Sequence, residues 1–365
     1  LEYAYGEVHP DYGPSRNPWN IAYGTSGSSS GSATSVAAGL DYGSFGSDTG
    51  GSIRLPAAYC GIAGLKPTYG RISRDGVVPL AWSLDHVGPM ARTVRDCAAL
   101  LQAVAGYDET DPGSAPRPVP DYVAAMAQRP AATIVGVLQP AADDGVEADV
   151  RMAFDAAAAA VADLGLPVVP VELPHPAHAA RALLALMYME ASAFHAANLR
   201  RRADDYSANT RERLELGLLL PGTRYVAAQR ARRVIVDAYR RLFERIDLLL
   251  TPVAASASYR LDDAPARPVL DTGDRMGPLI RFTGPFNLTG QPALSIPAGR
   301  TDAGLPIGVQ LVGRPFDETR LLQVGAALQE QLRDRIGRLT RGQRAAWSSA
   351  APPGVAPIPA LARPA

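Results

Sequence analysis

The sequence has 365 residues, of which 47% are hydrophobic and 20% are charged, a composition that suits a globular chain with a large core. Its 36 basic and 36 acidic side chains give a formal net charge of zero, so charge gives no reason to expect nucleic acid or a membrane surface as a partner. Two cysteines cannot form a disulfide framework and no apolar run has the length of a membrane span, so we expect a cytoplasmic protein.

The first part of the chain predicts short elements separated by glycine-rich loops. Residues 33–40 predict a short helix, and residues 41–48 predict a strand that leads into a second loop. Residues 61–73 are rich in turn-forming residues. Residues 92–106 carry apolar side chains at helical spacing and end in glycine, which predicts a helix.

The rest of the chain alternates strands and helices. Residues 133–140 and 167–174 are predicted strands that flank a predicted helix over 146–165, the order of a parallel α/β unit. The predicted fold class is therefore α/β, with a mixed β-sheet covered by helices. The remaining predicted elements are a helical region up to about residue 246, strands over 247–254, 292–299 and 305–313, and a helix over 317–337.

Two stretches rich in glycine and serine stand near the start, "SGSSSGSATSVAAGL" and "GSDTGGSIRLPAAYCG". Taken alone, the first has the composition of a flexible linker. A phosphate-binding loop is a second interpretation, but neither GxxxxGK[ST] nor GxGxxG occurs. A Ser-His-Asp triad is a third, since Asp85 and His86 follow the second stretch; without a GxSxG elbow, His86 is better interpreted as structural or pocket-lining.

The two stretches, in this order, resemble the amidase signature hydrolases. The resemblance continues in "SLDHVGPMARTVRD", "FNLTGQPALSIPAG" and "GLPIGVQLVGRPFDE", from Asn17 to about Glu330, and is weakest between Pro112 and Leu248. It implies a single α/β/α amidase domain over residues 1–344, with residues 345–365 as a disordered tail. It also implies an enzyme that cleaves carboxylic amides through a serine acyl-enzyme, with no metal and no cofactor.

The resemblance assigns a role to one serine in each stretch. Ser52 matches the acyl-accepting nucleophile, and Ser28, which precedes it by 24 residues, matches a serine that follows a cis peptide bond. Because a serine hydroxyl is a weak nucleophile, a neighbour must take its proton, and Ser28 can both donate and accept a hydrogen bond. We therefore expect Ser28 to relay the proton. Ser26 departs from the family, which usually has glycine there.

The second stretch also matches the family's oxyanion-binding loop. The resemblance assigns the backbone N–H groups of Thr49, Gly50, Gly51 and Ser52 to the oxyanion that forms when an amide carbonyl is attacked. Asp48 and Arg54, which flank this loop, are expected to support it through buried polar contacts.

The family's base is a lysine several dozen residues before the first serine, and here the pattern fails. Lys66, which lies after Ser52, is the only lysine in the sequence. We interpret Lys66 as structural. The expectation is then that the chain is N-terminally incomplete and lacks its catalytic lysine.

The substrate is less well determined. A transamidating branch of the family, which supplies the glutamine-cleaving component of glutamyl-tRNA(Gln) amidotransferase, usually carries an acidic residue where this chain has Ile280, and Trp82 suggests an apolar pocket wall. Both observations favour a stand-alone amidase for a small-molecule amide. The alternatives are such an amidotransferase component, which alone would involve nucleic acid, and a catalytically inactive scaffold. A homodimer is left open, and no membrane partner is expected.

Overall fold

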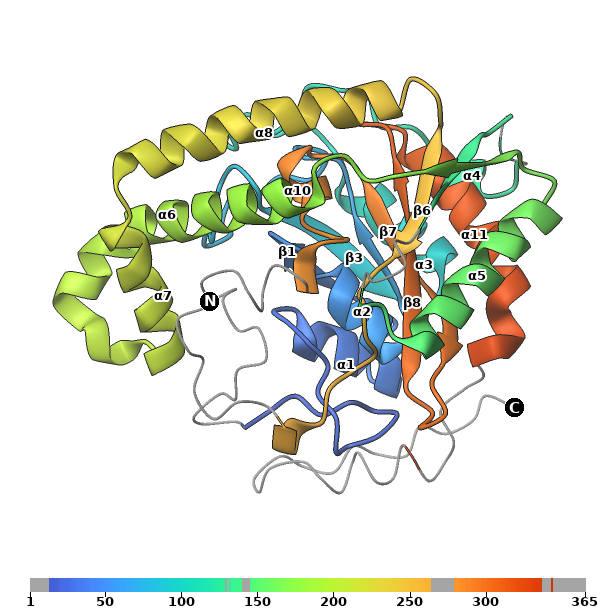
Figure 1. The fold of residues 1–365 in the computed structure, drawn as a ribbon, viewed down its shortest axis with the longest axis horizontal. Helices are drawn as coiled ribbons and strands as arrows, with labels where there is room; N and C mark the ends of the chain where they lie inside the picture. Colours follow the sequence, from blue (N-terminus) through green and yellow to red (C-terminus); the bar gives the residue numbers. More distant parts are fainter. Residues whose placement is uncertain are drawn as a thin grey trace.

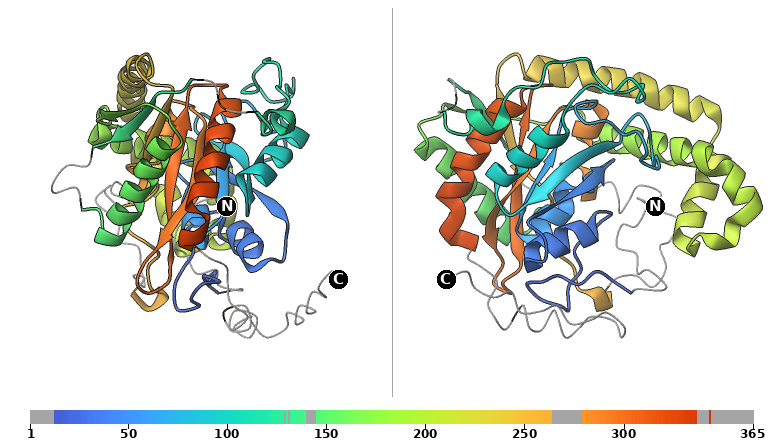
Figure 2. Two further views of the ribbon diagram at one scale, coloured as in Figure 1. Left: turned by 90° about the vertical axis from the view of Figure 1, so that its right-hand side faces the viewer. Right: turned by 180° about the vertical axis from the view of Figure 1, so that it is seen from behind.

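The computed structural model describes residues 13–128, 130, 132–139, 145–263, 279–336 and 343. These residues form one mixed sheet with helices on both faces (Figures 1 and 2). The expected tail over 345–365 lies outside the described residues.

Eight strands form the sheet in the order β1-β3-β2-β7-β8-β6-β4-β5. The strands from β1 to β6 in this order pair antiparallel, whereas β4 pairs parallel with both β6 and β5. The strands are β1 (Gly43–Asp48), β2 (Ala63–Lys66), β3 (His86–Ala91), β4 (Val135–Leu138), β5 (Val168–Val171), β6 (Leu248–Pro252), β7 (Ala293–Arg300) and β8 (Pro306–Gly313).

One face of the sheet packs on α3 (Val94–Val104), α5 (Ala148–Asp163) and α11 (Glu318–Ile336), and α4 (Tyr122–Ala125) packs against α3 and α11. The apolar side chains of β8 that point to this face, Ile307, Val309 and Leu311, lie in the largest hydrophobic core. Alternation along the strand then sends Gly308 and Gln310 to the other face. Strands β4 and β6 are buried along their whole length, as their continuous apolar runs require, whereas the edge strand β5 has exposed positions.

The other face is covered by α1 (Ser30–Ala38), α2 (Arg54–Cys60), α6 (Pro176–Arg202), α8 (Gly222–Leu242) and α10 (Pro285–Leu288). All residues of α2 are buried, because glycines let the helix approach the strands closely. A Cβ atom at Gly64 would lie 2.6 Å from the Cβ of Ala57, and one at Gly308 would lie 2.5 Å from the Cβ of Ala58. This close packing fixes the height of α2, and of the loop before it, above the sheet.

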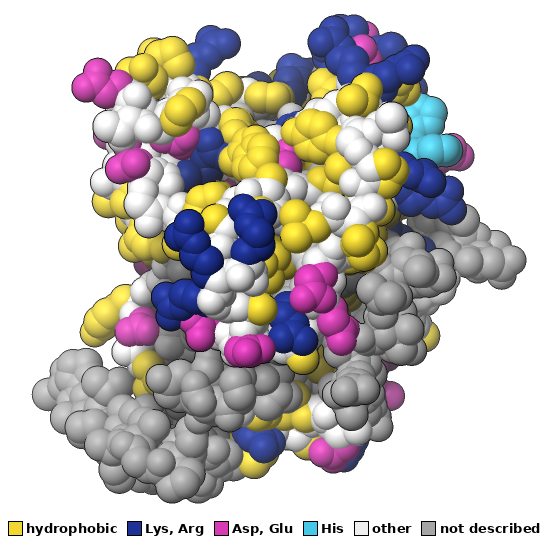
Figure 3. Space-filling view, turned by 90° about the vertical axis from the view of Figure 1, so that its left-hand side faces the viewer, with side chains coloured by type: hydrophobic (Ala, Val, Ile, Leu, Met, Phe, Trp, Pro, Cys, Tyr) yellow, Lys and Arg dark blue, Asp and Glu magenta, His cyan; other side chains and the backbone are white. Residues whose placement is uncertain are grey.

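Helices α6, α7 (Ala208–Leu219) and α8 extend together beyond the sheet, with α7 at the far end (Figure 1). The molecule is viewed from this end in Figure 3, where basic, acidic and apolar side chains are interspersed. None of the described helices is long and apolar enough to cross a membrane. The short helices η1 (Ala203–Asp205) and η2 (Leu261–Asp263) lie in connecting segments.

The predicted α/β class is confirmed, and so is the parallel unit built from β4, α5 and β5. The turn-rich residues 61–73 also contain a strand that was not predicted, because β2 occupies Ala63–Lys66 in the middle of the sheet. Glycine and lysine are unusual in a central strand, but here Gly64 makes room for α2.

The approach of α2 to β8 yields a stability prediction. Replacing Gly308 with alanine would push the new methyl group into Ala58, so we expect a loss of about 1–3 kcal/mol of unfolding free energy. Urea denaturation followed by circular dichroism measures it. Gly106→Ala is the matched control, since nothing lies within 4 Å of a Cβ there. Equal effects of the two substitutions would contradict the packing argument.

Candidate active site

The first glycine- and serine-rich stretch forms a tight loop that ends at α1. The peptide bond between Gly27 and Ser28 is cis, as the family resemblance implies. Ser26 has φ 61°, in the left-handed region that favours glycine, and its buried hydroxyl has no hydrogen-bond partner among the described residues. The next residue, Ser29, donates its backbone N–H to the carbonyl oxygen of Ser52 at 3.3 Å. The two stretches are therefore joined directly.

The second stretch connects the end of β1 to the start of α2. Its sharpest turn is at Gly51, where φ is 137°. A side chain there would also collide with its surroundings, because a Cβ would lie 2.6 Å from Oγ1 of Thr283 and 2.9 Å from Cδ1 of Leu55. Glycine is thus needed at Gly51 for both conformation and space.

The carboxylate of Asp48 holds this loop from inside. It accepts hydrogen bonds from the backbone N–H groups of Gly51 at 2.8 Å, Ile53 at 3.2 Å and Arg54 at 3.4 Å. The guanidinium of Arg54 donates two more, each at 2.9 Å, and neither side chain has any exposed area. Burial alone would raise the pKa of Asp48, but the charge and hydrogen bonds of Arg54 hold it well below its usual range. Asp48 is therefore an ionised, fully buried anchor.

Arg54 extends this anchor to three other elements. It donates to the carbonyl oxygen of Thr283 at 3.0 Å, to Oε1 of Gln310 at 3.1 Å and to Oδ1 of Asn287 at 2.7 Å. Asn287 returns a hydrogen bond from Nδ2 to the Asp48 carboxylate at 2.9 Å. Asp48 and Arg54 thus support the loop as a buried charge pair. The same pair is hydrogen-bonded to β8, to α10 and to the segment before α10.

Two backbone amides of the loop remain available. The N–H of Gly51 is taken by Asp48, whereas the N–H groups of Gly50 and Ser52 donate to no other described residue. The hydroxyls of Ser28 and Ser52 likewise make no hydrogen bond within the described part of the chain, and both side chains are half-buried. Reactive groups without internal partners thus gather where the two loops meet.

Thr283 was not identified from the sequence, although it orients this loop. Its hydroxyl donates to the carbonyl oxygen of Gly50 at 2.5 Å, which turns that peptide so that its oxygen points to Thr283. Beside it, a methyl group placed on Gly50 would lie 3.4 Å from Leu183 of α6 and 3.8 Å from Ile280. Both side chains are buried and apolar, so Gly50 has an apolar wall next to it.

Asp85 anchors the loop from the other side. Its buried carboxylate accepts a hydrogen bond from the hydroxyl of Thr49 at 2.6 Å and from the backbone N–H groups of Leu80 and Ala81. Burial raises the pKa of Asp85 to about 6, although these hydrogen bonds act to lower it. His86 does not form a triad with it, because its Nδ1 lies 2.6 Å from the Leu84 carbonyl oxygen.

The segment that carries Asp85 is itself held tightly. Glu190 of α6, which is buried, accepts hydrogen bonds from the N–H and the hydroxyl of Ser83 at 3.0 and 2.7 Å. The carbonyl oxygen of Trp82 accepts from the hydroxyl of Tyr69 at 2.7 Å and from Arg74. The Trp82 side chain is 44% exposed, so the segment presents an indole ring at the surface next to a rigid backbone.

Lys66 is fully buried at the end of β2. Its Nζ donates to the carbonyl oxygens of Gln291 at 2.6 Å and Pro67 at 3.2 Å. Burial and the charge of Arg54 lower its pKa well below the usual value, against the opposing effect of Asp48. These contacts are those of a structural lysine that ties β2 to the segment before β7.

The other polar candidates are unremarkable in the structure. Cys60 and Cys97 are buried free thiols, and burial raises the pKa of each. No group of three or more metal-binding side chains occurs among the described residues.

Fold and site together define a mixed α/β protein with two serine-bearing loops packed against each other on one face of its sheet. The family model described as "Amidase" matches residues 2–322. The chain therefore belongs to the amidase signature family of hydrolases.

Three similar proteins illustrate the range of the family. The A subunit of glutamyl-tRNA(Gln) amidotransferase from Geobacter metallireducens is 38% identical over 347 residues, which are 87% of this chain and 70% of that relative. A structure from a vestigial protein complex related to an s-triazine catabolic enzyme has a TM-score of 0.82 and 33% identity, over 93% of this chain and 73% of that one. A 6-aminohexanoate cyclic dimer hydrolase has a TM-score of 0.80 and 31% identity, over 89% and 72%.

The pKa of Asp85 yields a prediction that does not depend on activity. Above about pH 6 the ionised carboxylate accepts all its hydrogen bonds, and below it a proton displaces at least one of them. Since this pKa is raised on folding, ionisation of Asp85 also costs stability as the pH rises from about 4 to about 6. We expect tryptophan fluorescence, through Trp82, to change with an inflection near pH 6 in the folded chain.

The Asp85→Asn variant should lose this inflection, because its amide does not titrate, while keeping an acceptor for Thr49. A second variant, Asp111→Asn, removes another partly buried aspartate whose pKa is lowered and should leave the inflection in place. An unchanged titration in Asp85→Asn would contradict the assignment.

Proposed function

We propose that this protein hydrolyses small carboxylic amides through an acyl-enzyme on Ser52. The observation that carries the proposal is that two serine hydroxyls and two backbone amides without described partners lie together where the two loops pack against each other. The Gly50 and Ser52 N–H groups and the Ser28 and Ser52 hydroxyls have no partner among the described residues. The buried polar groups of Asp48, Arg54 and Asp85 beside them are hydrogen-bonded, so we take these open donors and hydroxyls as the groups left for a substrate.

The chemical steps follow from what each group can do. Ser28 accepts the proton of the Ser52 hydroxyl and at the same time hands its own hydroxyl proton on toward the amide nitrogen, while the Ser52 oxygen attacks the amide carbon. The oxyanion that forms accepts hydrogen bonds from the N–H groups of Gly50 and Ser52. Collapse breaks the C–N bond, the proton passes to the leaving nitrogen, and water then releases the acid from Ser52.

The roles of the neighbouring residues are positional. Gly51 keeps its amide on Asp48 and supplies the turn that presents Ser52. Thr49 is tied to Asp85, so the loop is fixed on both sides of Gly50. We do not assign Lys66 as the base, since its Nζ is already bonded to two carbonyl oxygens.

The walls of the site favour an apolar acyl group. Leu183 and Ile280 flank Gly50, and burying a charged substrate group against them without a partner would be costly. A neutral amide with an aliphatic or aromatic body is thus the preferred substrate class.

A second candidate function is that of the glutamine-dependent tRNA amidotransferase component. The identity of 38% to a relative with that name favours it. It requires recognition of glutamine, whose amino group calls for an acidic partner, whereas the described wall next to Gly50 carries Ile280. We therefore place it second.

Labelling and mutation test the roles of the two serines. A fluorophosphonate probe should attach to Ser52, and Ser52→Ala should abolish both labelling and hydrolysis of hexanamide. Ser28→Ala should slow labelling about 100-fold or more, because general-base help is lost while the backbone is kept. Peptide mass spectrometry locates the label, and Ser44→Ala, at a half-buried serine of the edge strand β1, serves as control. Labelling of another serine, or full-rate labelling of Ser28→Ala, would refute the roles.

Substrate comparison separates the two candidate functions. We expect kcat/KM for hexanamide to exceed that for L-glutamine by at least about tenfold, the discrimination that a few methylene groups in an apolar pocket provide. Ile280→Asp should reverse part of this preference, and Ile280→Leu should keep it. A wild-type preference for glutamine would favour the amidotransferase function instead.

A further inference from the structure

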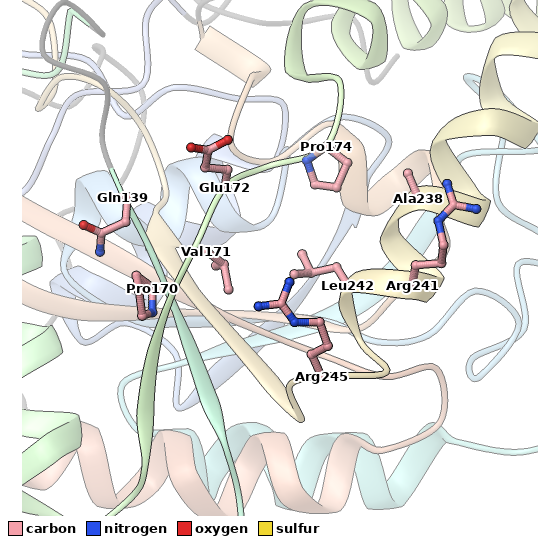
Figure 4. Close-up of a pocket in the computed structure, with 9 residues that line it drawn as sticks. All are labelled: Gln139, Pro170, Val171, Glu172, Pro174, Ala238, Arg241, Leu242 and Arg245. Atoms are coloured by element: carbon pink, nitrogen blue, oxygen red, sulfur yellow. The ribbon is translucent and has the colours of Figure 1, made fainter.

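A cavity lies at the far edge of the sheet, away from the serine loops. It has a volume of about 600 Å³, which lies within the usual range for small-molecule sites. None of its lining residues belongs to either loop. They come from β5, from the segments just after β4 and β5, and from the end of α8 and the turn after it. They are Gln139, Pro170, Val171, Glu172, Pro174, Ala238, Arg241, Leu242 and Arg245 (Figure 4).

The order and direction of the strands explain why a cavity forms at this position. β4 and β5 are adjacent and parallel, so their carboxyl ends, at Leu138 and Val171, lie side by side. After β4 the chain continues to α5 on one face of the sheet, and after β5 it continues to α6 on the other. Such a switch point leaves a crevice between the diverging segments, and open α/β sheets bind ligands there. Gln139 and Glu172, the first residues after the two strands, line the cavity.

Two arginines in the cavity are not engaged by other side chains of the described residues. Arg241 and Arg245 make no ion pair or hydrogen bond through their side chains with any described residue, and both are exposed. The nearest acids along the chain are already engaged, since Glu244 pairs with Arg240 and Asp247 pairs with Arg314. In Figure 4 the guanidinium of Arg245 reaches toward Val171 at the centre of the group.

The remaining lining decides what kind of anion fits. Five of the nine residues are apolar, namely Pro170, Val171, Pro174, Ala238 and Leu242, and they form the surface between the arginines and the strand. Glu172 offsets one of the two positive charges, which leaves one net positive charge for a ligand. An arginine guanidinium binds a carboxylate through two parallel hydrogen bonds. A single carboxylate on an apolar body satisfies both the charge and the surface.

We propose that this cavity is a second ligand site, which binds a small organic carboxylate between Arg241, Arg245 and the end of β5. The carboxylate lies on the arginines and the apolar body lies against Val171 and Leu242. Gln139 supplies a neutral donor. The site is independent of Ser52 and of the hydrolytic function proposed above.

Calorimetric titration with sodium benzoate tests the proposal, with benzyl alcohol as a neutral ligand of similar size. We expect benzoate to bind the wild-type chain and benzyl alcohol to bind much more weakly. The double variant Arg241→Gln/Arg245→Gln should lower benzoate affinity about tenfold or more, the effect of losing one charge-assisted contact. Glu172→Gln should raise it, because a like charge is removed. Circular dichroism verifies that each variant is folded.

The matched control removes two positive charges from α8 outside the cavity. Arg230→Gln/Arg233→Gln should leave benzoate affinity within about twofold, since exposed charges at a distance are screened by salt. Benzoate affinity that survives the cavity variant would place the ligand elsewhere, such as the serine loops, and would overturn the proposal. The proposal would also be overturned if benzyl alcohol bound as tightly as benzoate, or if the control variant lost as much benzoate affinity as the cavity variant. Binding of inorganic phosphate without binding of benzoate would overturn it too. Benzoate binding is measured without any assay of amide hydrolysis, so the result for Ser52→Ala neither supports nor weakens the proposal of this second site.

Discussion

The buried pair of Asp48 and Arg54 is the interaction on which the site depends. Both charges lie entirely out of contact with solvent, and each is matched by hydrogen bonds from or to several separate segments. Desolvating such a pair is expensive, and removing one partner from a buried pair typically costs about 3–5 kcal/mol because the other is left uncompensated. The arrangement is therefore a means of fixing geometry more than a source of stability. Because Arg54 bonds to β8, α10 and the segment before α10, the loop over residues 48–52 adopts its conformation only when all three are folded around it.

The loop is fixed at three consecutive residues. Asp85 holds the Thr49 side chain, Thr283 holds the Gly50 carbonyl, and Asp48 holds the Gly51 amide. The N–H groups of Gly50 and Ser52 beside these fixed points have no partner among the described residues, and they are the donors that we propose to meet a substrate. Rigid support around a few unsatisfied donors is the condition for electrostatic stabilisation of a developing charge, because the donors need not reorganise during the reaction.

The sequence predicted the parts of this protein that depend on local pattern. Helices α3, α5 and α11 and strands β4 to β8 follow from apolar periodicity, and the loops with Ser28 and Ser52 follow from a motif. The central strand β2 could not be predicted in this way, since its glycine and lysine fit only once α2 and Gln291 are packed on them. Thr283 was missed for a similar reason, because its contact with Gly50 joins residues 233 positions apart. Long-range partners leave no local signal in a single sequence.

The edge strand β5 has a further consequence for assembly. The carbonyl oxygen of Val171 accepts from Gln139 on the β4 side, so the neighbouring Pro170 has its backbone directed to the open edge. Proline has no N–H, which means that this edge lacks the donor that an incoming strand would need there. Two copies of the chain, or a stray peptide, are thereby discouraged from extending the sheet at β5. Sheet extension would have to use the opposite border at β1, whose partner on the inner side is β3.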